Sequence, residues 1–351
     1  MGSQHMDEGF GNDYVLPADR SYCETCAGVG SIMFSWRLLL ATGDPQYADL
    51  IERTLFNIIA ACPASDGRSF FYSNTLHQRS TASDAPVNDE GVCIRGASTQ
   101  RQPWFEVSCC PPDLARTLAS LSGYVATVDL DGVQVHQYIN AEIRTSFDSN
   151  RLVRLGIHTA YPKDGRVVIR VLESDGAPLA ITLRVPNWAS GAEVVDGPTR
   201  RPATPGTVTV RRGFLPGDEL VLELPVRARF TIPAAQIDAI RGCVAVERGP
   251  EVYCMESTDL QEPAAFDQLY VDPTIAPREQ SATPLLTGSK SILSAPPWPY
   301  HTLEKQKAEP PEAGSQDIPL IPYHTWGNRG ASSMRIWIPT VERLRAADTA
   351  G

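Results

Sequence analysis

The sequence of 351 residues predicts an α+β multidomain protein in which a helical portion precedes a longer region of β-strands. Apolar residues recur at helical spacing over roughly the first 125 positions and alternate with a period of two from about residue 127 onward. Turn sequences such as Asp-Gly and Pro-Gly-Asp separate the alternating runs. Together these observations favour helices followed by antiparallel β-sandwich domains.

Three helices are expected in the first portion. Residues 26–42 place apolar side chains on one face, and Gly43 is a typical helix end. Residues 45–61 repeat this spacing. A third helix is expected to begin at Pro111, since proline suits the first helical position, and this places Cys110 at or near the N-cap.

The segments around these helices give two further expectations. Residues 68–76 have the aromatic content of an extended segment, and the polar, Gly/Ser-rich residues 80–102 predict a long surface loop. The helix at residues 26–42 is apolar on more than one side and therefore requires neighbours on several sides. We interpret the chain as beginning inside a helical domain.

Several strands are expected after residue 127, with a Pro-rich stretch at residues 276–317. The runs that alternate or are rich in β-branched residues are 133–139, 167–171, 179–185, 206–210, 219–224, 243–254 and 334–338. The change of period and the break near Ile232-Pro233 predict three divisions, at residues 1–126, 127–232 and 233–351.

Composition excludes some classes of function. A net charge of -10 and a pI near 5.2 argue against nucleic-acid binding, because no basic stripe is present to contact phosphates. The sequence contains no apolar run close to the ~20 residues that span a bilayer, so no membrane partner is expected. The beginning of the chain has no secretory signal pattern, which predicts a cytoplasmic protein. A homodimer is compatible with the sequence.

The eight cysteines include two clusters with the ligand chemistry of zinc, Cys23-Glu24-Thr25-Cys26 and Cys109-Cys110. A disulfide between adjacent cysteines would be strained, so reduced thiols and a metal are favoured. Near a helix N-terminus the pKa of a thiol falls, which makes Cys109 and Cys110 candidates for ligand or nucleophile. Spacing alone leaves a closed structural zinc site and a catalytic site equally probable.

Two glutamates bear on that choice. Glu24 lies between two thiols and favours an adjustable catalytic site, although a glutamate in the first turn of a helix also stabilises the helix dipole. Glu8 lies in a polar-aromatic run and, taken alone, is an ordinary exposed carboxylate.

These motifs resemble glycoside hydrolase family 127, the β-L-arabinofuranosidases. The segment from Glu8 to Ala27 (EGFGNDYVLPADRSYCETCA) is similar to the catalytic signature of that family. Three further motifs are similar to the family: Phe70-Phe71-Tyr72-Ser73-Asn74, Cys109-Cys110-Pro111-Pro112 and Asn328-Arg329-Gly330. The resemblance runs from about residue 1 to 339, and Cys23 departs from it.

The resemblance implies a fold and a set of site residues. The fold would be the C-terminal portion of an (α/α)6 barrel followed by β-sandwich domains, without the N-terminal half of the barrel, so we expect low or absent activity from this chain alone. The zinc ligands implied are Glu24, Cys26, Cys109 and Cys110. Cys109 would be the nucleophile, Glu8 the general acid/base and Tyr72 a residue of the sugar pocket.

The resemblance also implies a retaining hydrolysis of β-L-arabinofuranosides, so an arabinofuranoside-containing oligosaccharide or glycoconjugate is the expected partner. A second interpretation is a non-catalytic, zinc-containing β-sandwich protein with a carbohydrate-binding or structural role. Its sugar-stacking candidates are Trp188, Trp298, Trp326 and Trp337. A thiol redox protein based on Cys23 and Cys26 is a third, less favoured interpretation, because no thioredoxin-like βαβ pattern surrounds them.

Overall fold

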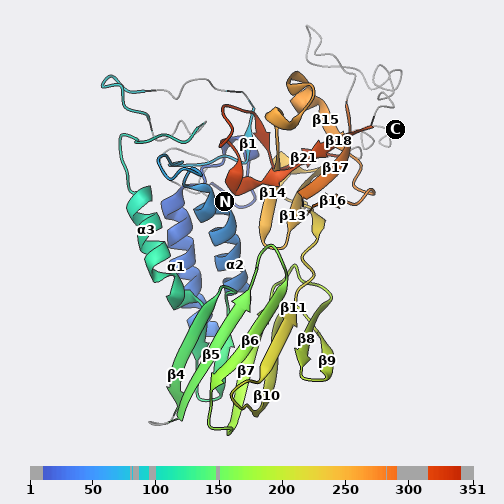
Figure 1. Cartoon of the computed structure of the whole chain (residues 1–351). Helices are drawn as coiled ribbons and strands as arrows, with labels where there is room; N and C mark the ends of the chain where they lie inside the picture. The colour runs from blue at the N-terminus through green and yellow to red at the C-terminus, as the bar shows by residue number, and fades with distance from the viewer. Residues whose placement is uncertain are drawn as a thin grey trace. The chain divides into compact units, whose positions relative to one another are not determined.

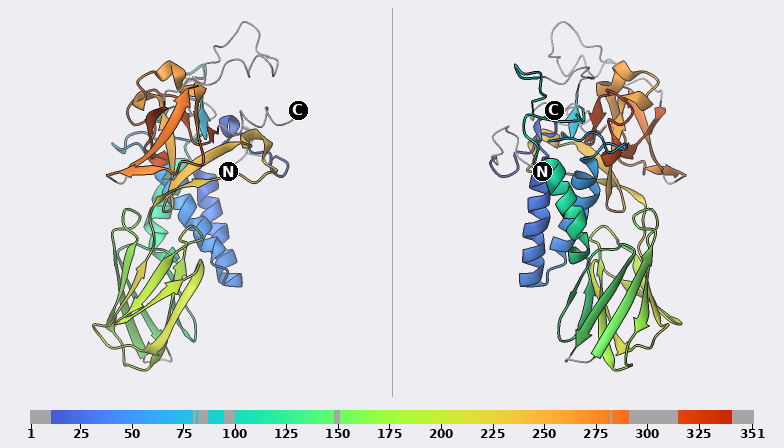
Figure 2. Two further views of the ribbon diagram at one scale, coloured as in Figure 1. Left: turned by 90° about the vertical axis from the view of Figure 1, so that its right-hand side faces the viewer. Right: turned by 60° about the vertical axis from the view of Figure 1, so that its left-hand side comes forward.

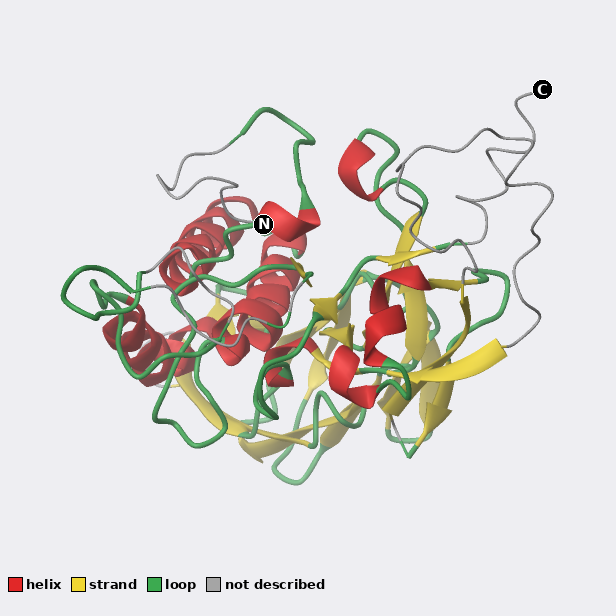
Figure 3. Ribbon diagram, turned by 90° about the horizontal axis from the view of Figure 1, so that it is seen from above, coloured by secondary structure: helices red, strands yellow, loops and turns green. Residues whose placement is uncertain are grey.

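The computed structural model of the protein describes residues 11–79, 81, 87–94, 100–147, 151–281, 283–290 and 315–340. The described chain has a mixed α+β, multidomain fold with many strands and few helices, which confirms the predicted class (Figure 1). Figure 3 shows that helical structure is limited to a small group of helices and some short turns, among many strands and loops.

The chain divides into two compact units. Unit 1 combines Met1–Gly28, Asn57–Pro111 and Ala228–Gly351, and unit 2 combines Val29–Phe56 with Pro112–Arg227. Each unit is therefore assembled from segments that are distant in the sequence. The expected linear division after residues 126 and 232 stays a prediction.

The α-helices are α1 (Thr25–Thr42), α2 (Gln46–Thr54) and α3 (Cys110–Ser120), and they run side by side in Figures 1 and 2. The helix predicted at residues 26–42 is confirmed to within one residue. The helix predicted at 45–61 is α-helical only to Thr54 and then widens into a π-helical turn, Leu55–Ile59. Short 3-10 helices occur at Ala18–Arg20, Leu121–Tyr124, Asp238–Ile240, Ser257–Asp259, Pro263–Gln268 and Tyr323–Thr325.

A single polar side chain accounts for the π-helical turn. The Asn57 side chain accepts a hydrogen bond from the Val252 backbone N–H at 2.8 Å and donates one to the Pro250 carbonyl at 2.9 Å. Asn57 is buried, so these two bonds satisfy an amide that would otherwise be costly to bury. The π-helical turn thus directs the Asn57 side chain towards the backbone of Pro250 and Val252.

Unit 2 contains two sheets, whose strands are given in their order across each sheet. The first comprises β10 (Gly206–Gly213), β7 (Pro178–Val185), β3 (Gly132–Val135) and β2 (Ala126–Val128). The second comprises β4 (Ala141–Phe147), β5 (Arg151–Thr159), β6 (Arg166–Glu173), β11 (Glu219–Glu223), β8 (Ala192–Asp196) and β9 (Thr199–Ala203). All pairings are antiparallel except that of β3 with β7.

One hydrophobic core joins the two sheets of unit 2, which form two layers in Figure 2. Val133, Ile181 and Leu183 contribute from the first sheet, and Leu155 and Ile169 contribute from the second; all five are fully buried. Burying a side chain of this size stabilises the fold by about 1.5–3 kcal/mol. The two sheets therefore depend on each other for stability.

Unit 1 also contains two sheets. One follows the order β1 (His77–Gln78), β20 (Met334–Arg335), β14 (Glu251–Glu256), β13 (Cys243–Arg248) and β12 (Ala228–Thr231), with β19 (Ile321–Pro322) paired to β14 and β21 (Ile338–Pro339) paired to β13. The other joins β15 (Leu269–Val271), β17 (Thr283–Lys290) and β16 (Arg278–Gln280), with β18 (Ser315–Pro319) paired to β17. The β-rich runs at 243–254 and 334–338 therefore each contain two short strands.

The core of unit 1 contains residues from two segments that are far apart in the sequence, around Phe71 and around Trp326. Phe71 stacks on Trp326 with ring centroids 5.1 Å apart, and both side chains are buried. Cys23 lies in the same core cluster and is 5% exposed. This places the extra cysteine of the Cys-x-x-Cys pattern among apolar side chains.

The helices carry apolar side chains on more than one face, as the sequence predicted. Phe34 of α1 is 64% exposed and Leu118 of α3 is 57% exposed. Helix α1 is also long and apolar enough, by length and composition alone, to cross a membrane. The expectation that no apolar run approaches spanning length is therefore wrong for this helix, although a buried core helix and a signal sequence meet the same criterion and 33% of this span is buried.

Candidate metal centre and active site

The candidate site is built on a short pairing between two segments of unit 1. The Cys23 N–H donates to the Asn74 carbonyl at 2.9 Å, and the Asn74 N–H donates back to Cys23 at 3.1 Å. The Thr25 N–H also donates to the Tyr72 carbonyl at 3.4 Å. The residues just before α1 are thereby fixed beside Tyr72.

Helix α1 begins immediately after that pairing. The Gly28 N–H donates to the Glu24 carbonyl at 3.1 Å, so Glu24 immediately precedes the first turn and Cys26 lies within it. A Cβ atom at Gly28 would lie 2.8 Å from Ile58 Cγ2, which is closer than carbon atoms pack. Glycine at this position therefore allows the first turn of α1 to approach Ile58.

Helix α3 supplies the paired cysteines. It begins at Cys110, one residue earlier than the predicted start at Pro111, so Cys109 occupies the position just before the helix. Pro111 and Pro112 lack N–H groups and lie in the first turn, where backbone N–H groups have no partner within the helix. The double proline is thus compatible with a helix that starts at Cys110.

The structure brings together the four predicted metal ligands. Each of Glu24, Cys26, Cys109 and Cys110 offers one ligand atom, and these atoms all lie within 4.8 Å of one another. The Cys26 sulfur lies 3.0 Å from that of Cys109 and 3.8 Å from that of Cys110. A Glu24 carboxylate oxygen lies 3.5 Å from the Cys109 sulfur. We call these four residues the thiol cluster.

Burial differs within the thiol cluster. Glu24 and Cys110 are buried, whereas Cys26 and Cys109 are partly exposed. Cys110 Sγ also lies 3.5 Å from the Tyr72 carbonyl oxygen, which helps to keep this thiol inside. Of the paired cysteines, Cys109 is therefore the one whose sulfur an incoming molecule can reach.

Tyr72 completes the surroundings of Cys109. Its hydroxyl lies 3.1 Å from the Cys109 sulfur, and its ring packs edge-on against Phe105 at 5.8 Å. The side chain is only 2% exposed, so its orientation is fixed by packing. The structure therefore places this predicted site residue directly against the candidate nucleophile.

Without a cation, the protein raises the pKa of the Cys109 thiol to about 11. Burial is the largest cause, followed by the hydrogen bond with Cys26, while the Tyr72 hydroxyl acts in the opposite direction. The lowered pKa expected from the helix N-terminus is thus outweighed by these neighbours. A nearby cation is what favours the thiolate in such a site.

Arg101 is a supporting residue that sequence reasoning missed, since it falls in the predicted surface loop at 80–102. The structure buries it to 8% exposure and places its guanidinium 4.3 Å from the centre of the Phe71 ring. It donates to the Ala61 carbonyl at 2.9 Å and to Trp326, and so holds the strand-like segment that carries Tyr72. Its polar neighbours in the sequence gave no signal of this burial.

The remaining predicted residue, Glu8, lies outside the described residues. Its position relative to the thiol cluster therefore rests on the resemblance alone.

Comparison with known proteins identifies the family. Three family models match the chain along most of its length: the catalytic domain of glycoside hydrolase family 127 β-L-arabinofuranosidases over residues 1–123, the middle domain over 132–226 and the C-terminal domain over 228–339. The chain belongs to glycoside hydrolase family 127, a family of enzymes.

Individual relatives agree with the family models. The chain is 30% identical to a non-reducing end β-L-arabinofuranosidase from Bifidobacterium longum subsp. longum, over 96% of this chain and 52% of that protein. It superimposes on the crystal structure of a family 127 β-L-arabinofuranosidase from Geobacillus stearothermophilus T6 with a TM-score of 0.82 and 29% identity, covering 97% of this chain and 53% of the other.

A second solved structure, described as a family 127 β-arabinofuranosidase, gives a TM-score of 0.78 at 28% identity, covering 97% of this chain and 53% of the other. The chain thus spans about half the length of the relatives it matches.

Proposed function

We propose that this chain carries the zinc-binding and nucleophilic part of a retaining β-L-arabinofuranosidase. The observation that carries the proposal is the thiol cluster itself, in which the most accessible of the paired thiols, Cys109, is contacted by Tyr72 at 3.1 Å. A closed structural site needs no such contact. The activities of the relatives, which are β-L-arabinofuranosidases, support the substrate class, a β-L-arabinofuranoside at the end of an oligosaccharide or glycoconjugate.

The donor set of the thiol cluster fits zinc. Sulfur ligands favour zinc over magnesium or calcium, and three sulfurs with one carboxylate complete a tetrahedral shell. In such a shell, Zn–S bonds of about 2.3 Å put ligand sulfurs about 3.8 Å apart. Cys26 and Cys110 already have this separation of 3.8 Å, whereas Cys26 and Cys109 are closer, at 3.0 Å. Zinc held by these residues would keep the thiols ionised.

The proposed reaction has two steps. In the first, the Cys109 thiolate forms a C–S bond with the anomeric carbon, the glycosidic C–O bond breaks, and Glu8 gives its proton to the leaving oxygen. In the second, Glu8 takes a proton from water, the hydroxide forms a new C–O bond, and the C–S bond breaks to restore the thiolate. Tyr72 orients the sulfur through its hydroxyl.

The finer details of the fold belong to the same proposal. We infer that α1, α2 and α3 represent the C-terminal portion of an (α/α)6 barrel and that the paired sheets represent β-sandwich domains. The exposed apolar side chains on α1 and α3 support the first inference, since helices of a barrel have neighbours on two sides. The shared core of the two sheets in unit 2 supports the second.

The test combines zinc content with hydrolysis of 4-nitrophenyl β-L-arabinofuranoside by the purified, reduced chain. We expect about one zinc per chain from the four ligands and a low turnover that the change Cys109→Ser reduces by at least about 1,000-fold. Cys93→Ser is the matched control, because Cys93 is also partly exposed but lies outside the thiol cluster.

Two outcomes would contradict the proposal. Turnover that survives Cys109→Ser would exclude Cys109 as the nucleophile. A purified, reduced chain that binds no zinc would exclude the metal site formed by the thiol cluster.

A further inference from the structure

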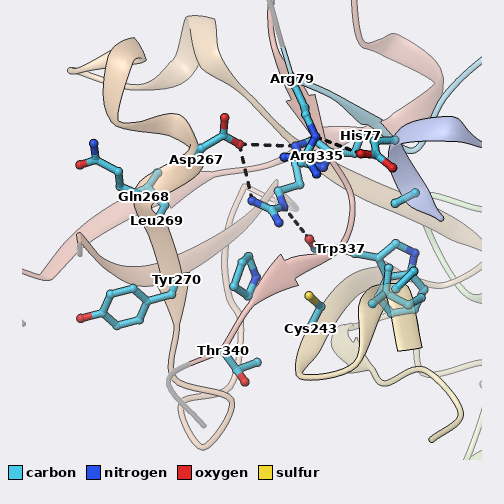
Figure 4. A pocket seen from close by; sticks show the side chains of 15 residues that line it. His77, Arg79, Cys243, Asp267, Gln268, Leu269, Tyr270, Arg335, Trp337 and Thr340 are labelled. Carbon is cyan, nitrogen blue, oxygen red and sulfur yellow. Dashed lines mark hydrogen bonds and ion pairs between the residues drawn. The ribbon is translucent and has the colours of Figure 1, made fainter. Parts of the chain in front are cut away.

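A cavity of about 480 Å³ lies in unit 1, apart from the thiol cluster. It is bordered by β1, β20 and β21 and by the 3-10 helix Pro263–Gln268 (Figure 4). Its lining includes neither Tyr72 nor any ligand of the thiol cluster. Cavities of this size are typical of sites for small molecules.

Charges of opposite sign are balanced around the cavity. Arg335 lies 3.7 Å from Asp267, and Arg79 contacts Asp19 at 3.0 Å, so each of the two arginines has a carboxylate beside it. Figure 4 shows the Asp267 carboxylate turned towards Arg335 and His77. Such a lining has no excess positive charge for an anion and no excess negative charge for a metal ion.

His77 adds a buried imidazole to the wall. Its side chain is 4% exposed, and its Nε2 has no hydrogen-bond partner among the described residues, lying 3.5 Å from the Asp267 carboxylate. Burial first, and then Arg335 and Arg79, lower the pKa of His77 to about 4, so its imidazole is neutral near pH 7. Because its contact with Asp267 is long, the Nε2 atom of His77 can also bind a hydroxyl group, which accepts or donates a hydrogen bond according to the tautomer of the ring.

Part of the cavity wall is apolar. Trp337 is partly exposed in the lining, and Ile240, Leu269 and Pro339 lie around it. A sugar ring has an apolar face of C–H groups and a periphery of hydroxyls, and it binds where an aromatic face lies beside paired carboxylate and guanidinium groups. The lining provides both kinds of contact.

We propose that this cavity is a second saccharide-binding site, which holds an uncharged sugar unit between Trp337 and the Arg335–Asp267 pair. The charge balance favours an uncharged ligand over an anion or a cation. The proposal depends only on this lining and stands even if the chain has no hydrolytic activity. In a glycosidase, such a site would hold a neighbouring part of the glycan.

The test is a titration of the whole 15N-labelled chain, carrying Cys109→Ser to prevent turnover, with L-arabinose, D-galactose and glycerol. The readout is the indole N–H signal of Trp337, assigned by its loss in Trp337→Phe. We expect one of the sugars, but not glycerol, to shift this signal with a dissociation constant in the millimolar range. Asp267→Asn should weaken binding at least about tenfold, because a hydrogen bond to a charged group is lost.

Asp317→Asn is the matched control, since Asp317 is also a half-exposed partner of an arginine, in a different part of unit 1. The indole signal of buried Trp326 reports whether each variant is folded. The proposal is overturned if neither sugar shifts the Trp337 signal at about 100 mM, which is far above a millimolar dissociation constant. It is also overturned if Asp267→Asn and Asp317→Asn, both folded, bind the sugar equally well.

Discussion

The thiol cluster of unit 1 and a buried cluster around Arg184 in unit 2 both gather ionisable groups away from water, but only the second is complete. The Arg184 side chain is fully buried and contacts the carboxylates of Asp49 and Glu52. Glu52 also accepts a hydrogen bond from the Tyr161 hydroxyl at 2.7 Å. We call Arg184, Asp49, Glu52 and Tyr161 the arginine cluster.

The two clusters differ in the balance between donors and acceptors. In the arginine cluster, burial disfavours the charged guanidinium, but the Glu52 carboxylate outweighs it, so the pKa of Arg184 is held above its ordinary value. In the thiol cluster, every ionised group would be negative, and burial raises the pKa of Cys109 instead. A buried cluster that supplies its own counter-charge stabilises the fold, whereas one that lacks a counter-charge is suited to hold a cation.

The largest expected effect that tests this comparison is on stability. Arg184→Met should lower the free energy of unfolding by about 3–5 kcal/mol, because it leaves two carboxylates partly or fully buried without a counter-charge. Arg200→Met is the control, since Arg200 also lies between two glutamates but is 49% exposed. Its loss should change the urea-denaturation midpoint far less than the loss of Arg184, because ion pairs exposed to water contribute little to stability. Equal losses for the two variants would show that the arginine cluster is not a stabilising unit.

A second, smaller effect concerns pH. The carbonyl of His136 accepts a hydrogen bond from Arg184, and its imidazole contacts Thr127 at 2.8 Å and the edge of Trp36. Burial and then Arg184 lower the pKa of His136 to about 4, so the folded state holds it neutral. Its contribution to stability is complete above pH 6.5, the usual value in an unfolded chain, and is lost as the pH falls towards 4.

The unsubstituted chain should lose unfolding free energy when the pH is lowered from 7 to 5. In His136→Gln this loss should be smaller by about 2 kcal/mol, because the substituted residue does not titrate. The comparison needs urea denaturation of both proteins at both pH values. His158→Gln is a suitable control, since His158 is an exposed residue of β5. An identical pH dependence in the unsubstituted chain and in His136→Gln would contradict the assignment of a buried neutral imidazole.

The smallest expected effect is at the thiol cluster. Tyr72→Phe removes the hydroxyl that acts to lower the pKa of Cys109. Alkylation of Cys109 by iodoacetamide in metal-free protein at pH 8 should slow by about tenfold, since one hydrogen bond to a thiolate is worth about 1.5 kcal/mol. Mass spectrometry of the Cys109 peptide measures the rate, with Tyr124→Phe as control. An unchanged rate would show that the Tyr72 hydroxyl has no influence on this thiol.

Much of the secondary structure follows from periodicity, but several strands do not. The strands expected at 167–171 and 179–185 are present because their inward side chains are all apolar. Strand β4 was not predicted, since charged and small polar side chains dominate its sequence, AEIRTSF, and most of it is only partly buried or exposed. The partners across the sheet, not the strand's own residues, decide its conformation.

The candidate site was also predicted only in part: the thiol cluster was found from the sequence, and Arg101 was not. The thiol cluster follows from four ligand-type residues in two motifs, although the residues alone left its purpose open and the family resemblance was needed to choose. Arg101 could not have been found in this way, because its role depends on carbonyl groups of Ala61, His324 and Trp326 that only the folded chain brings near it. Every residue has a backbone carbonyl, so the residue types in a sequence do not indicate which carbonyls will accept such hydrogen bonds.

The pairing of β1 with β20 has a consequence for the order in which the protein folds. His77 pairs with Arg335, and the Tyr323 hydroxyl donates to the carbonyl of Thr75, a contact between residues 248 positions apart. Contacts between such distant residues form slowly, because a long loop must close first. During synthesis, the segment that carries Tyr72 therefore cannot complete these contacts until residues 323–335 have been made, so its neighbouring thiols acquire their folded surroundings late.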